Sequence, residues 1–259
     1  MEVLSILTFI RTYMQPQTTS TSIAIPVAIV FGFGLIAAAV FFSGFGSAPA
    51  TAIKPSDVPA EPVKAEVRPL DDSDFVRGNP NAPIVVIEYS DYDCPFCKNF
   101  HDTMNTVMDE FAVGGKVAWA YRQFPLEQLH PNAPRISEAA FCVGELGGDE
   151  AFWKFSDSIF NEREVNEPTA MSRLPEFAEA AGVKTADFNT CLSSGRNKAK
   201  VEASIQEGVA AGAQGTPYSI VMVGDQQAVI NGAQPYAVVK QIIENLITQL
   251  EGEAALPTT

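Results

Sequence analysis

Hydrophobic and polar positions divide the chain into three stretches. Residues 12–53 carry no charge, and the segment Ile23–Phe42 within them is almost entirely apolar. Twenty helical residues at about 1.5 Å each span roughly 30 Å, the thickness of the hydrocarbon core of a membrane. The pattern therefore predicts a transmembrane anchor over residues 23–45, preceded by an N-terminal cytoplasmic tail over residues 1–22.

A cleaved signal peptide is the alternative interpretation of the same segment. The apolar region of a signal peptide is normally only about 7–15 residues long, which favours an uncleaved anchor. The small residues Ala48, Ala50 and Ala52 would nevertheless suit a cleavage site. Basic residues lie on both sides of the apolar segment, so the charge distribution does not decide its orientation.

The second stretch, residues 46–70, is rich in Pro and Ala and predicts an extended stalk. The third is a folded domain expected over residues 71–250, with a C-terminal tail at 251–259. Within the domain, apolar runs rich in β-branched residues predict strands, and apolar residues at helical spacing predict helices. The predicted strands are 83–90, 116–124, 217–223 and 227–232, and the predicted helices are 94–111, 235–250 and most of 131–212. The order is β-α-β, a helical block and β-β-α, which is an α/β arrangement.

Charge narrows the range of partners. The formal net charge is −14, and residues 1–70 hold four basic and four acidic side chains, so residues 71–259 carry all of it. A surface this acidic repels phosphate backbones, so we expect no nucleic acid among the partners.

The chemistry concentrates where the first predicted strand meets the first helix. Cys94 and Cys97 are separated by Pro95 and Phe96 in the sequence SDYDCPFCKNFH. Free N–H groups at a helix N-terminus stabilise a thiolate, so the pKa of Cys94 should fall below its usual value of about 8.5. Cys94 is expected to be the more exposed nucleophile, and Cys97, one turn later, to form or resolve a disulfide with it.

Two other roles remain open for this cysteine pair. With His101 it could supply part of a zinc site, but a tetrahedral zinc needs a fourth ligand and the other two cysteines lie far along the chain. A purely structural role is the second alternative. His101 could instead tune the thiolate, but because a lone histidine on a helix is more often a surface residue, we expect it to be exposed.

Residues 71–250 resemble the DsbA-like thiol:disulfide oxidoreductases. Their CPFC sequence matches the redox motif of that family, and Gly215-Thr216-Pro217 before a strand resembles its cis-proline loop. The resemblance implies a thioredoxin-like fold with a helical insertion at about 131–212, here preceded by one N-terminal transmembrane helix. It also implies that Thr216 and Pro217 bind the substrate backbone beside the disulfide. A trans proline that opens a strand is the alternative.

The resemblance implies roles for three further residues. Glu88 corresponds to a buried acid that moves protons at the inner cysteine, although a solvent-facing glutamate without a role is the alternative. Cys142 and Cys191 correspond to a structural disulfide, and two buried thiols are the alternative. If the bridge forms, the domain lies outside the reducing cytosol.

One departure from the family concerns the strength of the oxidant. The best-known oxidase has a histidine inside its CxxC motif, whereas this chain has Phe96, and Asp91 and Asp93 place negative charge nearby. We therefore expect Cys94 to be less acidic, and its disulfide less oxidising, than in that enzyme.

Together these features predict a membrane-anchored extracytoplasmic enzyme that exchanges protein thiols and disulfides through Cys94 and Cys97. Disulfide formation is the expected direction, without a cofactor or metal. The expected partners are unfolded or thiol-containing envelope proteins, a membrane redox partner, and the cytoplasmic membrane through the anchor. A reductase or isomerase, or a non-catalytic chaperone with the same fold, are the alternatives.

Overall fold

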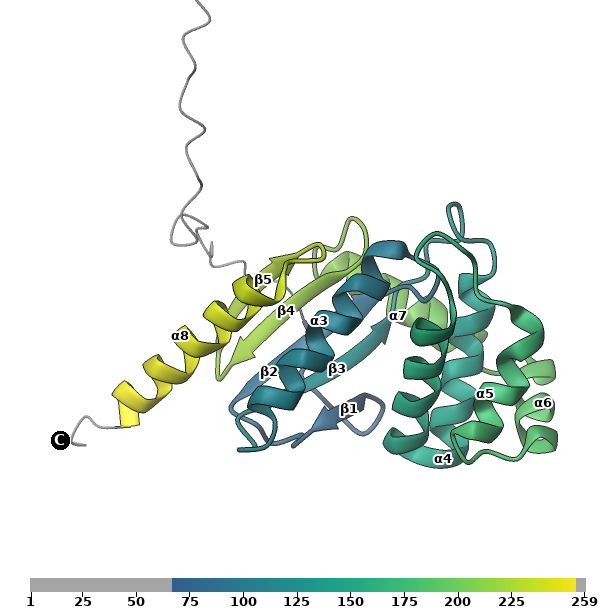
Figure 1. Cartoon of the computed structure of the whole chain (residues 1–259), viewed down its shortest axis with the longest axis horizontal. Coiled ribbons are helices and arrows are strands. Elements are labelled where there is room, and N and C mark those ends of the chain that lie inside the picture. Colours follow the sequence, from purple (N-terminus) through teal and green to yellow (C-terminus); the bar gives the residue numbers. More distant parts are fainter. Residues whose placement is uncertain (1–66, 255–259) are drawn as a thin grey trace, which may run out of the picture. The chain divides into compact units, whose positions relative to one another are not determined.

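The structure, a computed structural model, describes residues 67–254 (Figure 1). No helix within this range is both long and apolar enough to cross a membrane. The predicted anchor over 23–45 and the tail over 1–22 lie outside the described residues.

A single five-stranded sheet forms the centre of the domain, in the order β1-β3-β2-β4-β5. Its central strand β2 (Ile84–Ser90) runs parallel to β3 (Val117–Gln123) and antiparallel to β4 (Tyr218–Val223). The edges are β5 (Gln226–Asn231), paired with β4, and β1 (Phe75–Gly78), paired with β3. The sequence did not predict β1, because a run of four residues with Arg in it is too short for a clear alternation.

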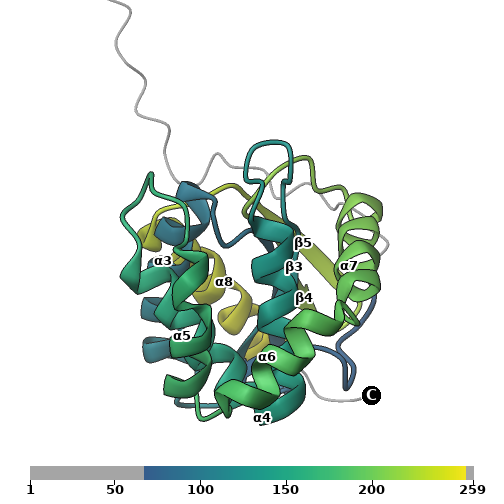
Figure 2. The same ribbon diagram turned by 90° about the vertical axis from the view of Figure 1, so that its right-hand side faces the viewer.

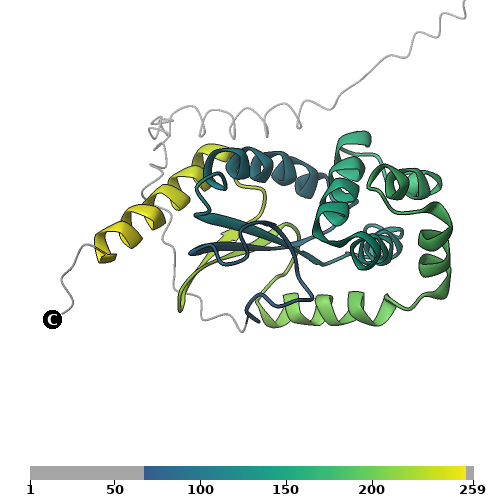
Figure 3. The same cartoon turned by 90° about the horizontal axis from the view of Figure 1, so that it is seen from below.

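Helices cover both faces of this sheet. Helices α3 (Pro95–Phe111) and α8 (Tyr236–Ala254) pack together on one face, and α7 (Lys198–Ala210) lies on the other (Figure 3). Helix α3 forms the crossover that joins the parallel strands β2 and β3, as parallel strands require. Helix α8 continues to residue 254, so four of the residues expected in the C-terminal tail are helical.

The helical block lies beside one end of the sheet (Figures 1 and 2). It consists of α4 (Ala133–Glu162), α5 (Leu174–Ala180) and α6 (Thr185–Ser194), with a short 3-10 turn before α5. Helix α4 is kinked at Gly148, whose φ of 75° lies in the left-handed region that glycine adopts readily. The expected order of β-α-β, a helical block and β-β-α is confirmed, with the unpredicted strand β1 preceding it.

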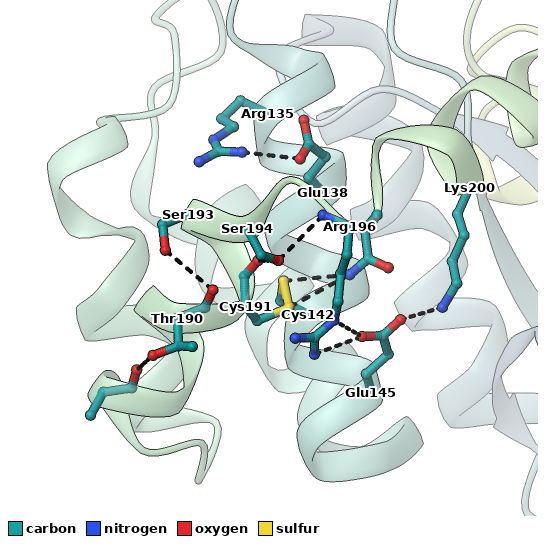
Figure 4. Close-up of a disulfide and its surroundings, with 12 residues drawn as sticks. Arg135, Glu138, Cys142, Glu145, Thr190, Cys191, Ser193, Ser194, Arg196 and Lys200 are labelled. Atoms are coloured by element: carbon teal, nitrogen blue, oxygen red, sulfur yellow. Dashed lines mark hydrogen bonds and ion pairs between the residues drawn. A yellow bond between two sulfur atoms is a disulfide. The ribbon is translucent and has the colours of Figure 1, made fainter.

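A disulfide joins two helices of the block. Cys142 on α4 and Cys191 on α6 form this bond, and their Cα atoms are 5.8 Å apart (Figure 4). The side-chain amide of Asn197 lies 3.4 Å from the sulfur of Cys142 and 3.6 Å from that of Cys191. Glu145 pairs with Arg196 at 3.0 Å next to the bridge. The bond therefore fixes α6 against α4.

Candidate active site

The CPFC sequence lies at the junction of β2 and α3. Cys94 is the residue immediately before α3, and Pro95 is its first residue. Proline suits this position because the N–H that it lacks would have no partner within the helix. The side chain of Cys94 is 4% exposed and that of Cys97 is fully buried, whereas Phe96 is 62% exposed. Cys94 is thus the sulfur that a substrate can reach.

The two thiols have opposite pKa shifts. The Cys97 thiol, as a hydrogen-bond donor to the Cys94 sulfur, lowers the pKa of Cys94 to about 6 against the effect of burial. The side chain of Thr216 and backbone N–H groups at the start of α3 add to this lowering. Burial, together with the nearby Cys94 thiolate, raises the pKa of Cys97 well above its ordinary value. One cysteine is therefore a thiolate at neutral pH while the other keeps its proton.

Glu88 on β2 is a buried acid at this site. Its side chain is 1% exposed, and Oε2 accepts a hydrogen bond of 2.9 Å from Nε1 of Trp119. Oε1 has no hydrogen-bond partner among the described residues. Burial raises the pKa of Glu88 to about 7, and its negative charge helps to raise the pKa of Cys97. A carboxyl group that titrates near neutrality beside a high-pKa thiol can exchange a proton with it.

The loop before β4 approaches the cysteines from a distant part of the sequence. The peptide bond between Thr216 and Pro217 is cis. The carbonyl oxygen of Thr216 lies 3.5 Å from Sγ of Cys94, although the two residues are 122 positions apart. The fold thus places the two residues expected to bind substrate directly beside the reactive sulfur.

Arg163 is a site residue that the sequence did not reveal. It follows α4, is only 6% exposed, and donates a 2.6 Å hydrogen bond from Nη2 to the carbonyl oxygen of Cys94. Its Nη1 donates to the carbonyl oxygen of Glu167 at 3.1 Å. In the same region, Oδ1 of Asp93 accepts a 2.8 Å hydrogen bond from the backbone N–H of Thr169. A single arginine after a helix carries no sequence signal for such a contact, because its partner is 69 residues away.

The expectation that His101 lies on the surface is wrong. Its side chain is fully buried, and Nε2 lies 2.8 Å from Oδ1 of Asp157 on α4. Its ring packs against Trp119 and Phe160, and burial lowers its pKa. The reason is that the helical block covers this side of α3, which the sequence pattern of α3 alone does not indicate. Among residues 67–254, no group of three or more His, Cys, Asp and Glu side chains is arranged to hold a metal ion.

Asp91, which we expected to disfavour the thiolate, has a structural role. Its buried carboxylate accepts hydrogen bonds from the N–H groups of Asp93 at 2.8 Å and Leu126 at 2.7 Å. Its Oδ2 also lies 2.8 Å from Nδ1 of His130. These contacts hold the turn before Cys94 against the loop that follows β3.

Comparison with protein families and solved structures identifies the fold. A sequence model of the family described as Thioredoxin matches residues 71–245. The oxidised crystal structure of BdbD from Bacillus subtilis is 23% identical, with a TM-score of 0.61 over 70% of this chain and 97% of that chain. The crystal structure of α-DsbA1 from Wolbachia pipientis is 20% identical, with a TM-score of 0.61 over 72% of this chain and 96% of that chain. The resemblance to DsbA-like proteins and the thioredoxin-like fold with a helical insertion are thereby confirmed.

Curated relatives share part of the chain. The Na(+)/H(+) antiporter NhaA 1 from Mycolicibacterium gilvum is 36% identical over 136 residues, which are 51% of this chain and 20% of that protein. The Na(+)/H(+) antiporter NhaA 3 from Salinispora tropica is 28% identical over 150 residues, which are 58% of this chain and 22% of that protein. The chain spans about a fifth of the length of these relatives.

Proposed function

Because the chain belongs to the thioredoxin family, whose sequence model matches residues 71–245, we propose that it is a thiol–disulfide oxidoreductase that acts on proteins. The observation that carries this proposal is the opposite shift of the two thiols in one CxxC pair. Cys94 is reachable and has a pKa of about 6, whereas Cys97 is fully buried and has a raised pKa. A low-pKa sulfur beside a protonated partner is the arrangement that thiol–disulfide exchange requires.

The expected direction is disulfide formation. In the oxidised enzyme, a substrate thiolate attacks Sγ of Cys94, so that a mixed disulfide forms and the bond between Cys94 and Cys97 breaks. Cys97 leaves as a thiolate and takes up a proton. A second substrate thiolate then attacks the substrate sulfur of the mixed disulfide, which releases the substrate disulfide and the Cys94 thiolate. The two electrons taken from the substrate remain on the cysteine pair until a membrane redox partner removes them.

Glu88 is the proposed proton donor and acceptor for Cys97. Its pKa of about 7 lets it hold or release a proton at neutral pH. Its free Oε1 is available for that proton, since Oε2 already accepts a hydrogen bond from Trp119. The acid would protonate the Cys97 thiolate as it leaves, and remove the proton again when Cys97 attacks in the reverse reaction.

Thr216 and Pro217 are proposed to hold the substrate. The carbonyl oxygen of Thr216 is 3.5 Å from Sγ of Cys94, so a chain bound at this loop would present its sulfur to Cys94. Proximity of this kind turns a reaction between two molecules into one within a complex.

The test is the redox potential of the cysteine pair in the full chain, titrated against glutathione. A pKa of about 6 for Cys94 lies between about 3.5 for DsbA and about 7 for thioredoxin, so we expect a potential between roughly −120 and −270 mV. A value near −270 mV would reverse the proposed direction and indicate a reductase. The absence of reversible titration, with the Cys94→Ala variant giving the same response, would contradict the proposal as a whole.

We also propose that the domain works on the extracytoplasmic side of a membrane, anchored through residues 23–45. Three observations support this location. The segment is apolar over a membrane-spanning length, Cys142 and Cys191 form a disulfide, and the curated relatives are named as antiporters, a class of membrane protein. Unfolded envelope proteins would be the substrates. Protease treatment of intact spheroplasts should degrade the domain, whereas protection until the membrane is lysed would place it on the cytoplasmic side.

A further inference from the structure

A pocket of about 400 Å³ lies beside the reactive cysteine. Three segments contribute to it: the redox motif, the loop between β3 and α4, and the loop after α4. Asp93 and Pro95 come from the first of these, Leu129 from the second, and Glu167 from the third. Because Asp93 and Pro95 flank Cys94 in the chain, a peptide whose cysteine reaches Cys94 can place a neighbouring residue at this pocket.

The walls of the pocket include exposed apolar groups. Leu129 is 71% exposed, and Pro131 and Pro168 also line the pocket. Phe96 and Val165, both exposed, lie on two of the same three segments. Apolar side chains left open to solvent beside a reactive group are typical of a surface that binds another chain.

The exposed charges on these segments are acidic. Glu127, Glu164 and Glu167 are exposed, and their carboxylates form no ion pair with any residue in the range 67–254. Asp93 is 6% exposed and lines the pocket. While its Oδ1 accepts the N–H of Thr169, its Oδ2 accepts no hydrogen bond from a described residue.

The cations near the pocket are already engaged. Arg163 is buried and donates its hydrogen bonds to carbonyl oxygens, although its charge interacts with that of Asp93. Lys98 donates to the carbonyl oxygen of Phe160, and Nδ1 of His130 lies 2.8 Å from Oδ2 of Asp91. A ligand at the pocket would therefore meet the carboxylate of Glu167, which forms no ion pair with any residue in the range 67–254.

We infer that this pocket selects substrate segments that carry lysine or arginine next to the reacting cysteine. This inference rests on the proposed function and names its substrate class. The cationic side chain would lie against Glu167 and the free oxygen of Asp93, and its aliphatic stem would pack on Leu129 and the prolines. Complementary charge of this kind acts mainly on the rate of association and on specificity.

The test uses two peptides with one cysteine each, capped at both ends, with lysine in one and glutamate in the other at the two flanking positions. The rate at which each peptide reduces the Cys94–Cys97 disulfide of the full chain is measured. It is divided by the rate at which the same peptide reduces the small disulfide 2-hydroxyethyl disulfide, which removes differences in the intrinsic reactivity of the two thiols. At low salt we expect the lysine peptide to react at least about tenfold faster than the glutamate peptide. The ratio should fall in 1 M salt, where the screening length is about 3 Å.

Two sets of substitutions locate the effect. The pocket variant is Glu127→Gln/Glu164→Gln/Glu167→Gln, which removes the glutamate that lines the pocket and the exposed glutamates of the two contributing loops. The control variant removes the same charge from exposed positions outside these loops, as Asp109→Asn/Glu202→Gln/Glu244→Gln. We expect the pocket variant to lower the lysine-to-glutamate ratio at least about threefold more than the control variant.

Asp93→Asn supplies an independent second test. It removes the buried charge but keeps an oxygen for the N–H of Thr169, so it should lower the ratio further when combined with the pocket variant. Asp93→Asn also changes the charge near the Cys94 thiolate. The rate of each peptide with this variant is therefore divided by the rate of uncharged dithiothreitol with the same variant.

The outcomes separate this inference from the proposed function. A ratio near one in the unmodified chain, or equal losses in the pocket and control variants, would overturn the inference while leaving the enzyme active. If neither peptide nor dithiothreitol opens the disulfide, the proposed function fails as well.

Discussion

The buried carboxyl group of Glu88 should make the stability of the domain depend on pH in a specific way. Burial raises its pKa from 4.5 to about 7. Since one unit of pKa is worth about 1.4 kcal/mol, ionising this group in the folded protein costs about 3 kcal/mol more than in the unfolded chain. The replacement Glu88→Gln removes the titration, and its carbonyl oxygen can still accept the hydrogen bond from Trp119.

The sign follows from the raised pKa. Below pH 4.5 the carboxyl group is protonated in both states, so it contributes no pH-dependent difference. Between pH 4.5 and 7 the unfolded chain loses the proton while the folded chain keeps it, so the stability of the native protein falls as the pH rises. Above pH 7 both states are ionised and the loss is complete at about 3 kcal/mol. Relative to the native sequence, Glu88→Gln should therefore gain about 3 kcal/mol between pH 4 and pH 8.

The assay is urea unfolding of the full chain at pH 4, 6 and 8. Both proteins carry Cys94→Ala/Cys97→Ala, so that the redox state does not vary. The amide left unpaired at the position of Oε1 adds a cost that does not depend on pH, so the quantity compared is the change in the stability difference with pH. The exposed residue Glu127, replaced by Gln, serves as the control. A stability difference for Glu88→Gln that stays constant from pH 4 to pH 8 would refute the assignment of a raised pKa to Glu88.

Three further predictions concern the surroundings of the site. Cys97→Ala removes the donor that most lowers the pKa of Cys94, so the pH profile of Cys94 alkylation by iodoacetamide should move up by about one to two units; an unchanged profile would contradict the assignment. Arg163→Met leaves the carbonyl oxygen of Cys94 and those of the loop after α4 without their donor. Urea unfolding should therefore show a free energy of unfolding lower by about 2–4 kcal/mol. A decrease below about 0.5 kcal/mol would show that these contacts are dispensable. Cys142→Ala/Cys191→Ala opens a loop with a sequence separation of 49, so the same assay should show a loss of about 4 kcal/mol with the Cys94 alkylation profile unchanged. A shifted alkylation profile in that variant would mean that the bridge also tunes the thiol.

Local patterns predicted the elements that carry the cysteines. The run of β-branched residues at 83–90 corresponds to β2 (Ile84–Ser90), and the expected helix at 94–111 corresponds to α3 (Pro95–Phe111). Such features depend on the alternation and capping of neighbouring residues, which the sequence displays directly. Glu88 lies six positions before Cys94 in the same segment, and its role as a buried acid came from the resemblance to DsbA-like proteins.

Contacts across long sequence separations were not predictable in the same way. His101 lies 56 positions from Asp157, and Arg163 lies 69 positions from Cys94. Whether a histidine on an amphipathic helix is exposed depends on what covers that side of the helix, and here α4 covers it. Strand β1 likewise pairs with β3 alone among the described strands, and the paired residues lie 40 to 46 positions apart in the chain.

The helical block is part of the active site and not an appendage to it. Polar contacts connect the C-terminal end of α4 and the loop after it to the redox end of α3, namely Asp93 to Thr169, Cys94 to Arg163, Lys98 to Phe160 and His101 to Asp157. A movement of the block away from the sheet would have to break these hydrogen bonds or carry the start of α3 with it. The disulfide between Cys142 and Cys191 holds α6 against α4, the helix whose C-terminal end supplies several of these partners. The position of Cys94 is therefore set from two sides, by the sheet through β2 and by the helical block through residues 157–169.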